Sequence, residues 1–200
     1  MTLFYPNGQP YRAPNVSAEE PPQTVNYGHR GMTLEEDLNV TNQYYIDSDQ
    51  AVIYKKPTPV QIVHVDYPRR SAAKITEAYF RKASTTDYNG VYKGKYIDFE
   101  AKETTHANYI PLKNFHEHQV DHMIRIQYHG GIGFIIVRFT PANQVFLLDA
   151  AYLVSCWKQA KQKKGRKSIP KTLFQEKGRL VPQNYLPRID YLRVVNDVYF

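Results

Sequence analysis

The sequence predicts an α/β fold, because segments with the two-residue period of a strand alternate with segments that have the period of a helix. Polar and apolar residues alternate from Tyr96 to Lys102, and the apolar runs 133–137 and 144–148 have strand length. Thr33 and Glu36, and again Asn114 and Glu117, have the spacing of a capping box, which predicts a helix start at each pair.

The first expected helix carries an acid on its inner side. Leu38, Asn42 and Tyr45 follow Glu35 at steps of three and four residues, which places these residues on one stripe. We therefore expect Glu35 to face inward, while Glu36 is occupied at the cap. An inward acid is a candidate metal ligand, although partial exposure in the first turn is the ordinary explanation.

The remaining elements follow from the same patterns. Segments 51–54 and 60–65 are expected to form a strand pair, and the alternation of 75–79 favours a strand over a helix. The helix that begins at Asn114 has Phe115, Gln119, His122, Met123 and Ile126 along one stripe. Asp149 is expected to cap a helix that runs to about Lys161, and residues 161–167 are expected to form a basic loop. Such a loop is by default a solvated surface segment, and the sharper alternative is that it contacts phosphate.

Composition limits the classes of function. The 200 residues carry a net charge of +7 and a pI of about 9.3, which suits a polyanionic partner such as nucleic acid. The single cysteine, Cys156, excludes an intramolecular disulfide and a cysteine-cluster zinc site, and fits a reducing cytoplasm. No apolar run is long enough for a membrane span. Residues 1–28 are rich in Pro, Asn and Gln and are expected to be disordered, which leaves 29–200 as one domain.

A hairpin from Asp87 to Lys102 carries the chemical signal. Turn signals at 89–90 and 93–94 allow Asp87 to fold back beside Glu100, and Asp98, Glu100 and Lys102 share one strand face. Two carboxylates can hold a divalent cation, and a lysine beside them can stabilise a phosphate or an attacking water. Taken alone, these residues also fit a surface strand whose charges merely pair across strands.

A second motif competes with this hairpin. His118 and His122 have the spacing of a helical zinc site, but Gln119 stands where a metalloprotease has its catalytic glutamate. His116, His118 and His122 are therefore expected at the surface or facing DNA. The sequence contains no nucleophile elbow, Walker loop or dinucleotide fingerprint, which argues against an ATPase.

Longer blocks resemble a known family, the RecU-type Holliday junction resolvases of the PD-(D/E)xK nuclease superfamily. The resemblance implies a central mixed β-sheet flanked by helices, a restriction-endonuclease-like core with a projecting stalk at about 55–72. It also implies a homodimer that nicks four-way DNA junctions symmetrically with Mg2+ or Mn2+, and a second role in modulating the RecA recombinase. The matching blocks are 30–39, 55–63, 67–73, 84–90, 96–104, 165–169 and 187–191.

The resemblance also implies roles for single residues. Asp87, Glu100 and Lys102 match the nuclease motif, and Glu35 matches an acid from the first helix, so Asp87, Glu100 and Glu35 are the expected metal ligands. Thr86 stands where the superfamily has its proline. The alternative is a non-catalytic DNA-binding accessory of recombination, in which these acids are structural. The candidate DNA-binding residues are Arg30, Lys55, Lys56, Arg69 and Arg70.

Overall fold

A computed structural model describes residues 32–69, 72–81 and 85–200. The expected disordered tail and two expected DNA-binding residues, Arg30 and Arg70, lie outside these ranges. Within them, no helix combines the length and the apolar composition needed to cross a bilayer.

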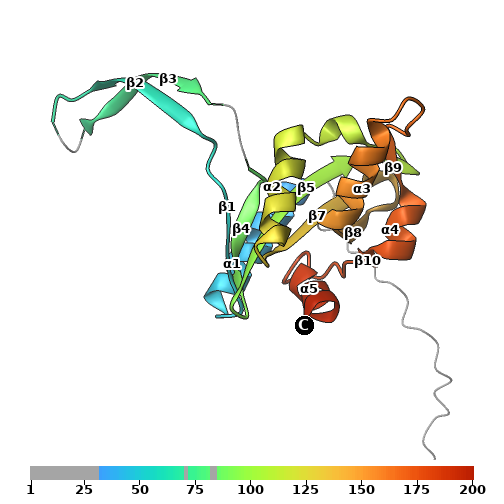
Figure 1. The fold of residues 1–200 in the computed structure, drawn as a ribbon. Coiled ribbons are helices and arrows are strands. Elements are labelled where there is room, and N and C mark those ends of the chain that lie inside the picture. The colour runs from blue at the N-terminus through green and yellow to red at the C-terminus, as the bar shows by residue number, and fades with distance from the viewer. Residues whose placement is uncertain (1–31, 70–71, 82–84) are drawn as a thin grey trace, which may run out of the picture. The chain divides into compact units, whose positions relative to one another are not determined.

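A mixed six-stranded sheet forms the centre of the fold, which confirms the predicted class (Figure 1). Its order is β1-β4-β5-β7-β8-β10; β5 and β7 are parallel, and the other neighbouring pairs are antiparallel. The strands are β1 (Val52–Lys55), β4 (Tyr88–Tyr92), β5 (Lys95–Thr104), β7 (Ile132–Phe139), β8 (Gln144–Asp149) and β10 (Arg179–Leu180).

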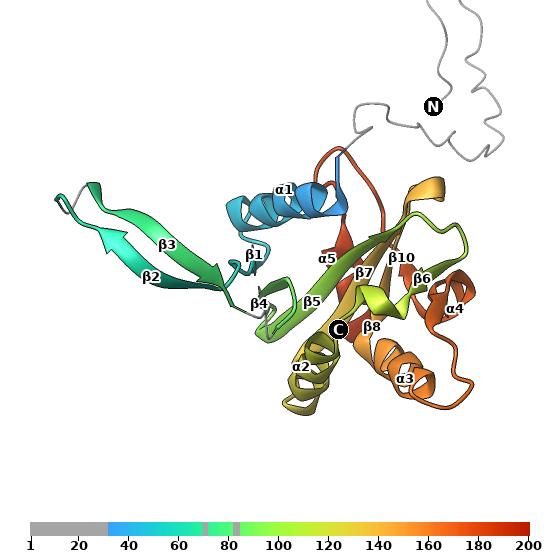
Figure 2. The ribbon, with the colours of Figure 1, turned by 90° about the horizontal axis from the view of Figure 1, so that it is seen from above.

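Helices cover both faces of this sheet (Figure 2). On one face, α1 (Leu34–Asp47) and α5 (Tyr191–Tyr199) pack against Ile97, Phe99 and alternate residues of β7. On the other face, α2 (Glu117–Tyr128), α3 (Ala150–Ala160) and α4 (Lys171–Lys177) pack against the intervening residues of β7. Every residue of β7 is buried, because both of its faces are covered.

The predicted capping box of α1 is confirmed, but the inward acid is not the expected one. Thr33 N donates to Glu36 Oε2 at 2.7 Å, and Glu36 N donates to Thr33 Oγ1 at 3.2 Å. Glu35 is exposed, so its inward orientation was a wrong prediction. The buried stripe centres on Leu38 and leaves Glu35 at its edge, whereas Asp37 is buried.

Asp37 lies between two arginines from distant segments. Arg138 of β7 contacts Asp37 Oδ2 at 2.5 Å, and Arg188, which precedes α5, contacts Asp37 Oδ1 at 3.3 Å. Buried charges require such partners. This network joins α1, the sheet and the chain that leads into α5.

The hairpin of β4 and β5 turns at Lys93 and Gly94, which have φ of 47° and 72°. This matches the second predicted turn signal, since a two-residue hairpin loop favours positive φ. The first signal does not form a turn, because Asn89 and Gly90 lie inside β4. Gly90 is needed for a close approach: an added Cβ would lie 2.0 Å from the carbonyl oxygen of Val52 in β1.

A two-stranded ribbon is inserted in the chain between β1 and β4, which are themselves neighbours in the sheet. It consists of β2 (Val60–Asp66) and β3 (Lys74–Phe80), which pair with each other and stand apart from the sheet (Figures 1 and 2). The expected strand at 75–79 is confirmed. The expected pairing of 51–54 with 60–65 is wrong, because β1 pairs with β4 and the prolines at 57 and 59 separate it from β2. The ribbon starts within the predicted stalk range and continues to Phe80.

The second predicted helix begins later than its sequence signal. Residues Leu112–Asn114 form a short 3-10 turn, η3, and His116 is the N-cap of α2, with its backbone N donating to Gln119 Oε1 at 2.9 Å. Asp149 caps α3 as predicted, accepting from Ala151 N at 2.8 Å. The remaining elements are β6 (Tyr109–Pro111), η4 (Thr140–Ala142) and β9 (Ser168–Pro170), of which β9 pairs with β6.

Candidate active site

Asp87, Glu100 and Lys102 come together beside the junction of β4 and β5. The register pairs Tyr88 with Phe99, so Asp87, one residue earlier, lies opposite Glu100. Asp87 N donates to Glu100 Oε2 at 3.2 Å. Lys102 Nζ forms an ion pair with Glu100 Oε1 and lies 3.6 Å from Asp87 Oδ2. The structure thus gathers the acid pair and lysine that the sequence predicts as one site.

Burial gives Glu100 unusual electrostatics. Its side chain is fully buried, and this desolvation raises the pKa of Glu100 to about 8; Lys102 opposes the shift and Asp87 adds to it. For Lys102, burial by itself lowers the pKa, but the two carboxylates outweigh it and hold the pKa above the usual lysine value. Lys102 is therefore a cation at neutral pH, and one ammonium serves two carboxylates.

Asp98 lies two residues earlier on the same face and has a different environment. Its carboxylate contacts Lys56 Nζ at 2.7 Å, Tyr96 OH at 3.0 Å and His122 Nε2 at 3.1 Å. The Thr86 hydroxyl also donates to it. We call Asp98 with these four partners the Asp98 cluster. The His122 side chain is partly buried, 20% exposed, and engaged with Asp98; its expected orientation toward DNA stays a prediction.

Glu35, in the first turn of α1, lies beside Tyr88, whose hydroxyl contacts the Glu35 carbonyl oxygen at 3.5 Å. It forms an ion pair with Lys55, which pairs in register with Tyr88, and the Tyr88 ring stacks on Phe99 of the α1-facing core at 4.8 Å. In the part of the chain that the structure describes, no hydrogen bond or ion pair joins Glu35 to Asp87 or Glu100. Across residues 32–69, 72–81 and 85–200, no three His, Cys, Asp or Glu side chains gather closely enough to hold a metal ion.

Tyr88 links the three acids electrostatically. Burial raises the pKa of Tyr88, and the charges of Glu35, Asp87 and Glu100 raise it further. The Tyr88 hydroxyl contacts Asn39 Oδ1 at 3.2 Å. Sequence patterns gave no sign of this role, because Tyr88 reads as an ordinary strand residue.

The expected DNA-binding residues divide into two groups. Lys55 and Lys56 are engaged with Glu35 and Asp98, respectively. Arg69 is exposed between the two ribbon strands. Lys56 therefore has a structural partner that the sequence did not predict.

Comparison with known proteins identifies the family. The profile of the family Recombination protein U, RecU, matches residues 29–197. This chain belongs to the RecU family. The Holliday junction resolvase RecU of Geobacillus thermodenitrificans is 58% identical over 200 residues, which cover 100% of this chain and 99% of the relative. The protein of that name from Bacillus cereus strain G9842 is 53% identical over 100% of both chains.

One solved structure is more distant. The Holliday junction resolvase Hjc of Archaeoglobus fulgidus matches 70% of this chain and 88% of its own with 10% identity and a TM-score of 0.39, and this similarity carries no argument here.

The RecU-family site has a donor set that suits a hard divalent cation. The carboxylates of Asp87 and Glu100 both contact the Lys102 ammonium, and Glu100 Oε1 is buried with only that ion pair. Mg2+ is commonly bound through one or two carboxylates, with waters and substrate phosphate completing its shell. Burial raises the pKa of Glu100, and a divalent cation would favour its charged form by adding positive charge to that of Lys102. The residues present therefore fit such an ion.

Proposed function

We propose that this chain is an endonuclease that resolves four-way DNA junctions by nicking, with Asp87, Glu100 and Lys102 as its catalytic residues. The observation that carries the proposal is that the buried Glu100 and the partly exposed Asp87 share the Lys102 ammonium. The net charge of +7 suits a DNA substrate. The curated relatives named above carry the name Holliday junction resolvase, which gives the substrate class.

Asp87 and Glu100 would hold a Mg2+ ion, for which Mn2+ can substitute. A bound divalent cation polarises the scissile phosphate and lowers the pKa of water. The protein's own contribution is the strand register, which places Asp87, immediately before β4, opposite Glu100 on β5. This register supplies the positioning on which phosphoryl chemistry depends.

Lys102 would stabilise the charge that develops on the phosphate. Its ammonium lies between the two carboxylates, which raise its pKa, so Lys102 is positively charged. With a cation held by Asp87 and Glu100, this ammonium would be available to a phosphate oxygen. Substitution of Lys102 by Ala removes this charge without removing either metal ligand.

Glu35 would be an auxiliary acid at the edge of the site. Its side chain is exposed and pairs with Lys55, whose own side chain is also exposed. A DNA phosphate that binds Lys55 would release Glu35, whose charge already reaches Tyr88 together with those of Asp87 and Glu100. We expect a smaller loss of cleavage on removing Glu35 than on removing Glu100.

The ribbon and a second copy of the chain would supply selectivity for junctions. Nearly all side chains of β2 and β3 are exposed, as expected for a segment that contacts something outside the fold. Two symmetric nicks require two sites, so we propose a homodimer with one ribbon for each site, the arrangement that the family resemblance implies. Sedimentation of the purified chain tests the dimer directly.

The deciding experiment is cleavage of a labelled mobile four-way junction by saturating protein in EDTA, Mg2+ or Ca2+. We expect symmetric nicks with Mg2+, no cleavage in EDTA, and binding with little cleavage in Ca2+, which accepts looser geometry. Glu100→Gln is the test variant, and Glu176→Gln, which changes an exposed acid on α4, is the matched control. Binding without cleavage in every condition would instead identify a non-catalytic DNA-binding accessory.

A further inference from the structure

The C-terminal end of α3 and the loop that follows it form a concentrated positive surface. From residue 150 to residue 175 the chain has no acid, and its cations cluster between Lys158 and Lys171. All six cations from 158 to 167 are exposed. We call these six the α3 basic turn: Lys158, Lys161, Lys163, Lys164, Arg166 and Lys167.

This turn is folded tightly rather than extended. Gln162 N donates to Gln159 O and Gly165 N donates to Gln162 O, each at 3.0 Å. Gly165 approaches the helix so closely that an added Cβ would lie 1.9 Å from the carbonyl oxygen of Gln159. Lys167 O accepts from Leu112 N at 3.0 Å, which ties the end of the turn to η3. A surface fixed in this way loses little conformational entropy on binding.

Most of the positive charge has no internal acidic partner. Lys161 pairs with Glu117 at 2.5 Å, and the Lys167 ammonium donates to Ala160 O. Among the residues that the structure describes, Lys163 and Lys164 form no ion pair, and Arg166 uses only its Nε, which donates to Ser168 Oγ at 3.1 Å. The terminal amino groups of Arg166 therefore remain available for bidentate contact with a phosphate.

The turn lies on the same face of the sheet as the candidate active site. Glu117, the partner of Lys161, begins α2, and His122 of the same helix contacts Asp98 on β5. α3 packs beside α2, and packed helices have axes about 8–10 Å apart. The basic turn and Lys102 thus lie on the same face of the sheet, as a single DNA duplex that contacts both requires.

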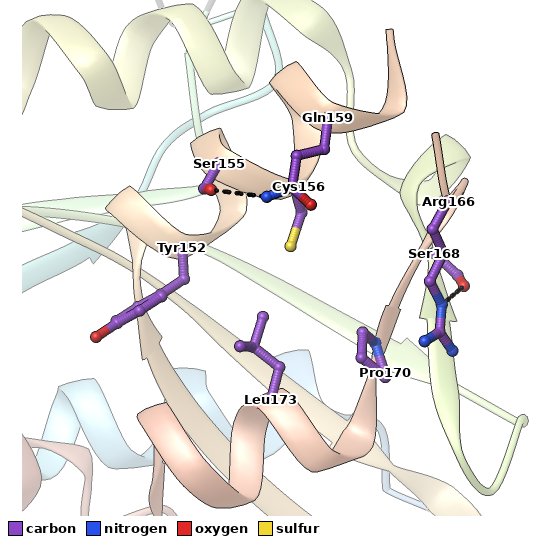
Figure 3. A pocket seen from close by; sticks show the side chains of 8 residues that line it. All are labelled: Tyr152, Ser155, Cys156, Gln159, Arg166, Ser168, Pro170 and Leu173. Atoms are coloured by element: carbon purple, nitrogen blue, oxygen red, sulfur yellow. Dashed lines mark hydrogen bonds between the residues drawn. The ribbon is translucent and has the colours of Figure 1, made fainter. Parts of the chain in front are cut away.

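A pocket of about 290 Å³ opens between α3, β9 and α4 beside Arg166 (Figure 3). Cys156 and Ser155 of α3 line one side, and Arg166 and Ser168 line the other. Cys156 is half-buried, and burial raises the pKa of its thiol. Because it is the single cysteine of the chain, its alkylation reports on this face alone.

We propose that the α3 basic turn binds backbone phosphates of a DNA duplex that extends from the active site. The partner is double-stranded DNA recognised by charge, without base contacts, since lysines on a fixed turn match closely spaced phosphates and carry no sequence information. The proposal rests on the proposed function only in naming DNA as the substrate. It adds a second contact surface, separate from the ribbon, that serves linear and branched DNA alike.

The test compares two variants with the same charge loss, Lys163→Gln/Lys164→Gln and Lys95→Gln/Arg193→Gln. The control residues are exposed, at the start of β5 and on α5 of the opposite face. Binding to linear duplex is measured in EDTA at several salt concentrations, so cleavage is not needed. The slope of log K against log salt is negative, and we expect the first variant to reduce its magnitude by about 2, roughly one for each lost phosphate contact. Equal slopes for both variants would overturn the proposal.

Alkylation of Cys156 by iodoacetamide gives a second readout. The reaction is followed at about pH 8.5, because the thiolate is the reactive form. We expect duplex DNA to slow alkylation several-fold in the parent protein, and to slow it less in Lys163→Gln/Lys164→Gln. High salt should restore the rate. An alkylation rate that saturating DNA leaves unchanged would overturn the placement of DNA on this face. If the parent protein did not cleave junctions but showed both the expected salt dependence and the protection of Cys156 by DNA, only the proposed function would be contradicted.

Discussion

Asp98 and Glu100 lie two residues apart on the same face of β5, and both are fully buried, yet their surroundings differ. Asp98 has four side-chain partners. Two of them join it to other elements: Lys56 directly follows β1, and His122 lies on α2. Glu100 has one lysine and one backbone N–H. Asp98 therefore stabilises the fold, whereas the carboxylate of Glu100 has few partners and can bind a cation.

The physical basis of the difference is the cost of burying charge. A buried carboxylate without enough partners is destabilising, and proteins keep such groups where function requires them. In the Asp98 cluster the carboxylate has enough hydrogen-bond and charge partners, and these join β5 to three other segments of the chain. Burial raises the pKa of Glu100 to about 8, because its few partners do not offset the loss of hydration.

The largest expected effect is on catalysis by Glu100→Gln. We expect cleavage of the four-way junction to fall by at least ~1,000-fold, because the amide is a poor ligand for a hard cation. The melting temperature should stay within a few degrees of the parent, since an amide removes a buried charge. Rates come from single-turnover cleavage with saturating protein, and Glu176→Gln serves as the control. Parental cleavage by Glu100→Gln would show that Glu100 is not catalytic.

Asp98→Ala should act on stability instead. Removing this acid leaves Lys56 and His122 without their partner, and breaking a buried pair costs about 3–5 kcal/mol. For a chain of this size, that loss lowers the melting temperature on the order of 10 °C. Urea denaturation measures the free energy of unfolding. A variant as stable as the parent would contradict a structural role for the Asp98 cluster.

His122→Ala removes one of the four partners and should have a smaller effect on stability. We expect a loss of about 1.5–3 kcal/mol, the range for a hydrogen bond to a charged group. A double-mutant cycle with Asp98→Ala measures the coupling between the two side chains. Additive losses would mean that the contact between His122 and Asp98 contributes nothing.

Glu35→Gln gives the smallest expected change in this series. Because Glu35 is exposed and paired with Lys55, we expect cleavage to fall by about tenfold with no loss of stability. The measurement is the single-turnover rate at one fixed salt concentration. A loss as large as that of Glu100→Gln would place Glu35 among the essential ligands.

Sequence patterns predicted the site better than its surroundings. The period of two along β5 and the Lys93–Gly94 turn were enough to bring Asp87 to Glu100, because both signals are local. The pattern could not distinguish Asp98 from Glu100, since three of the four partners of Asp98 come from segments 12 to 42 residues away. The misjudged orientation of Glu35 has the same cause: a residue at the edge of a helical stripe faces whatever the tertiary packing places there.

The most direct test of the central claim is metal binding without DNA. Mn2+ binding is measured by electron paramagnetic resonance for the parent, Glu100→Gln and Asp98→Asn, each verified as folded. We expect Glu100→Gln to lose most of its Mn2+ binding and Asp98→Asn to retain it, because Glu100, unlike Asp98, offers an oxygen donor that is not already engaged by several partners. Equal Mn2+ binding by the parent and Glu100→Gln, or selective loss in Asp98→Asn, would contradict this claim.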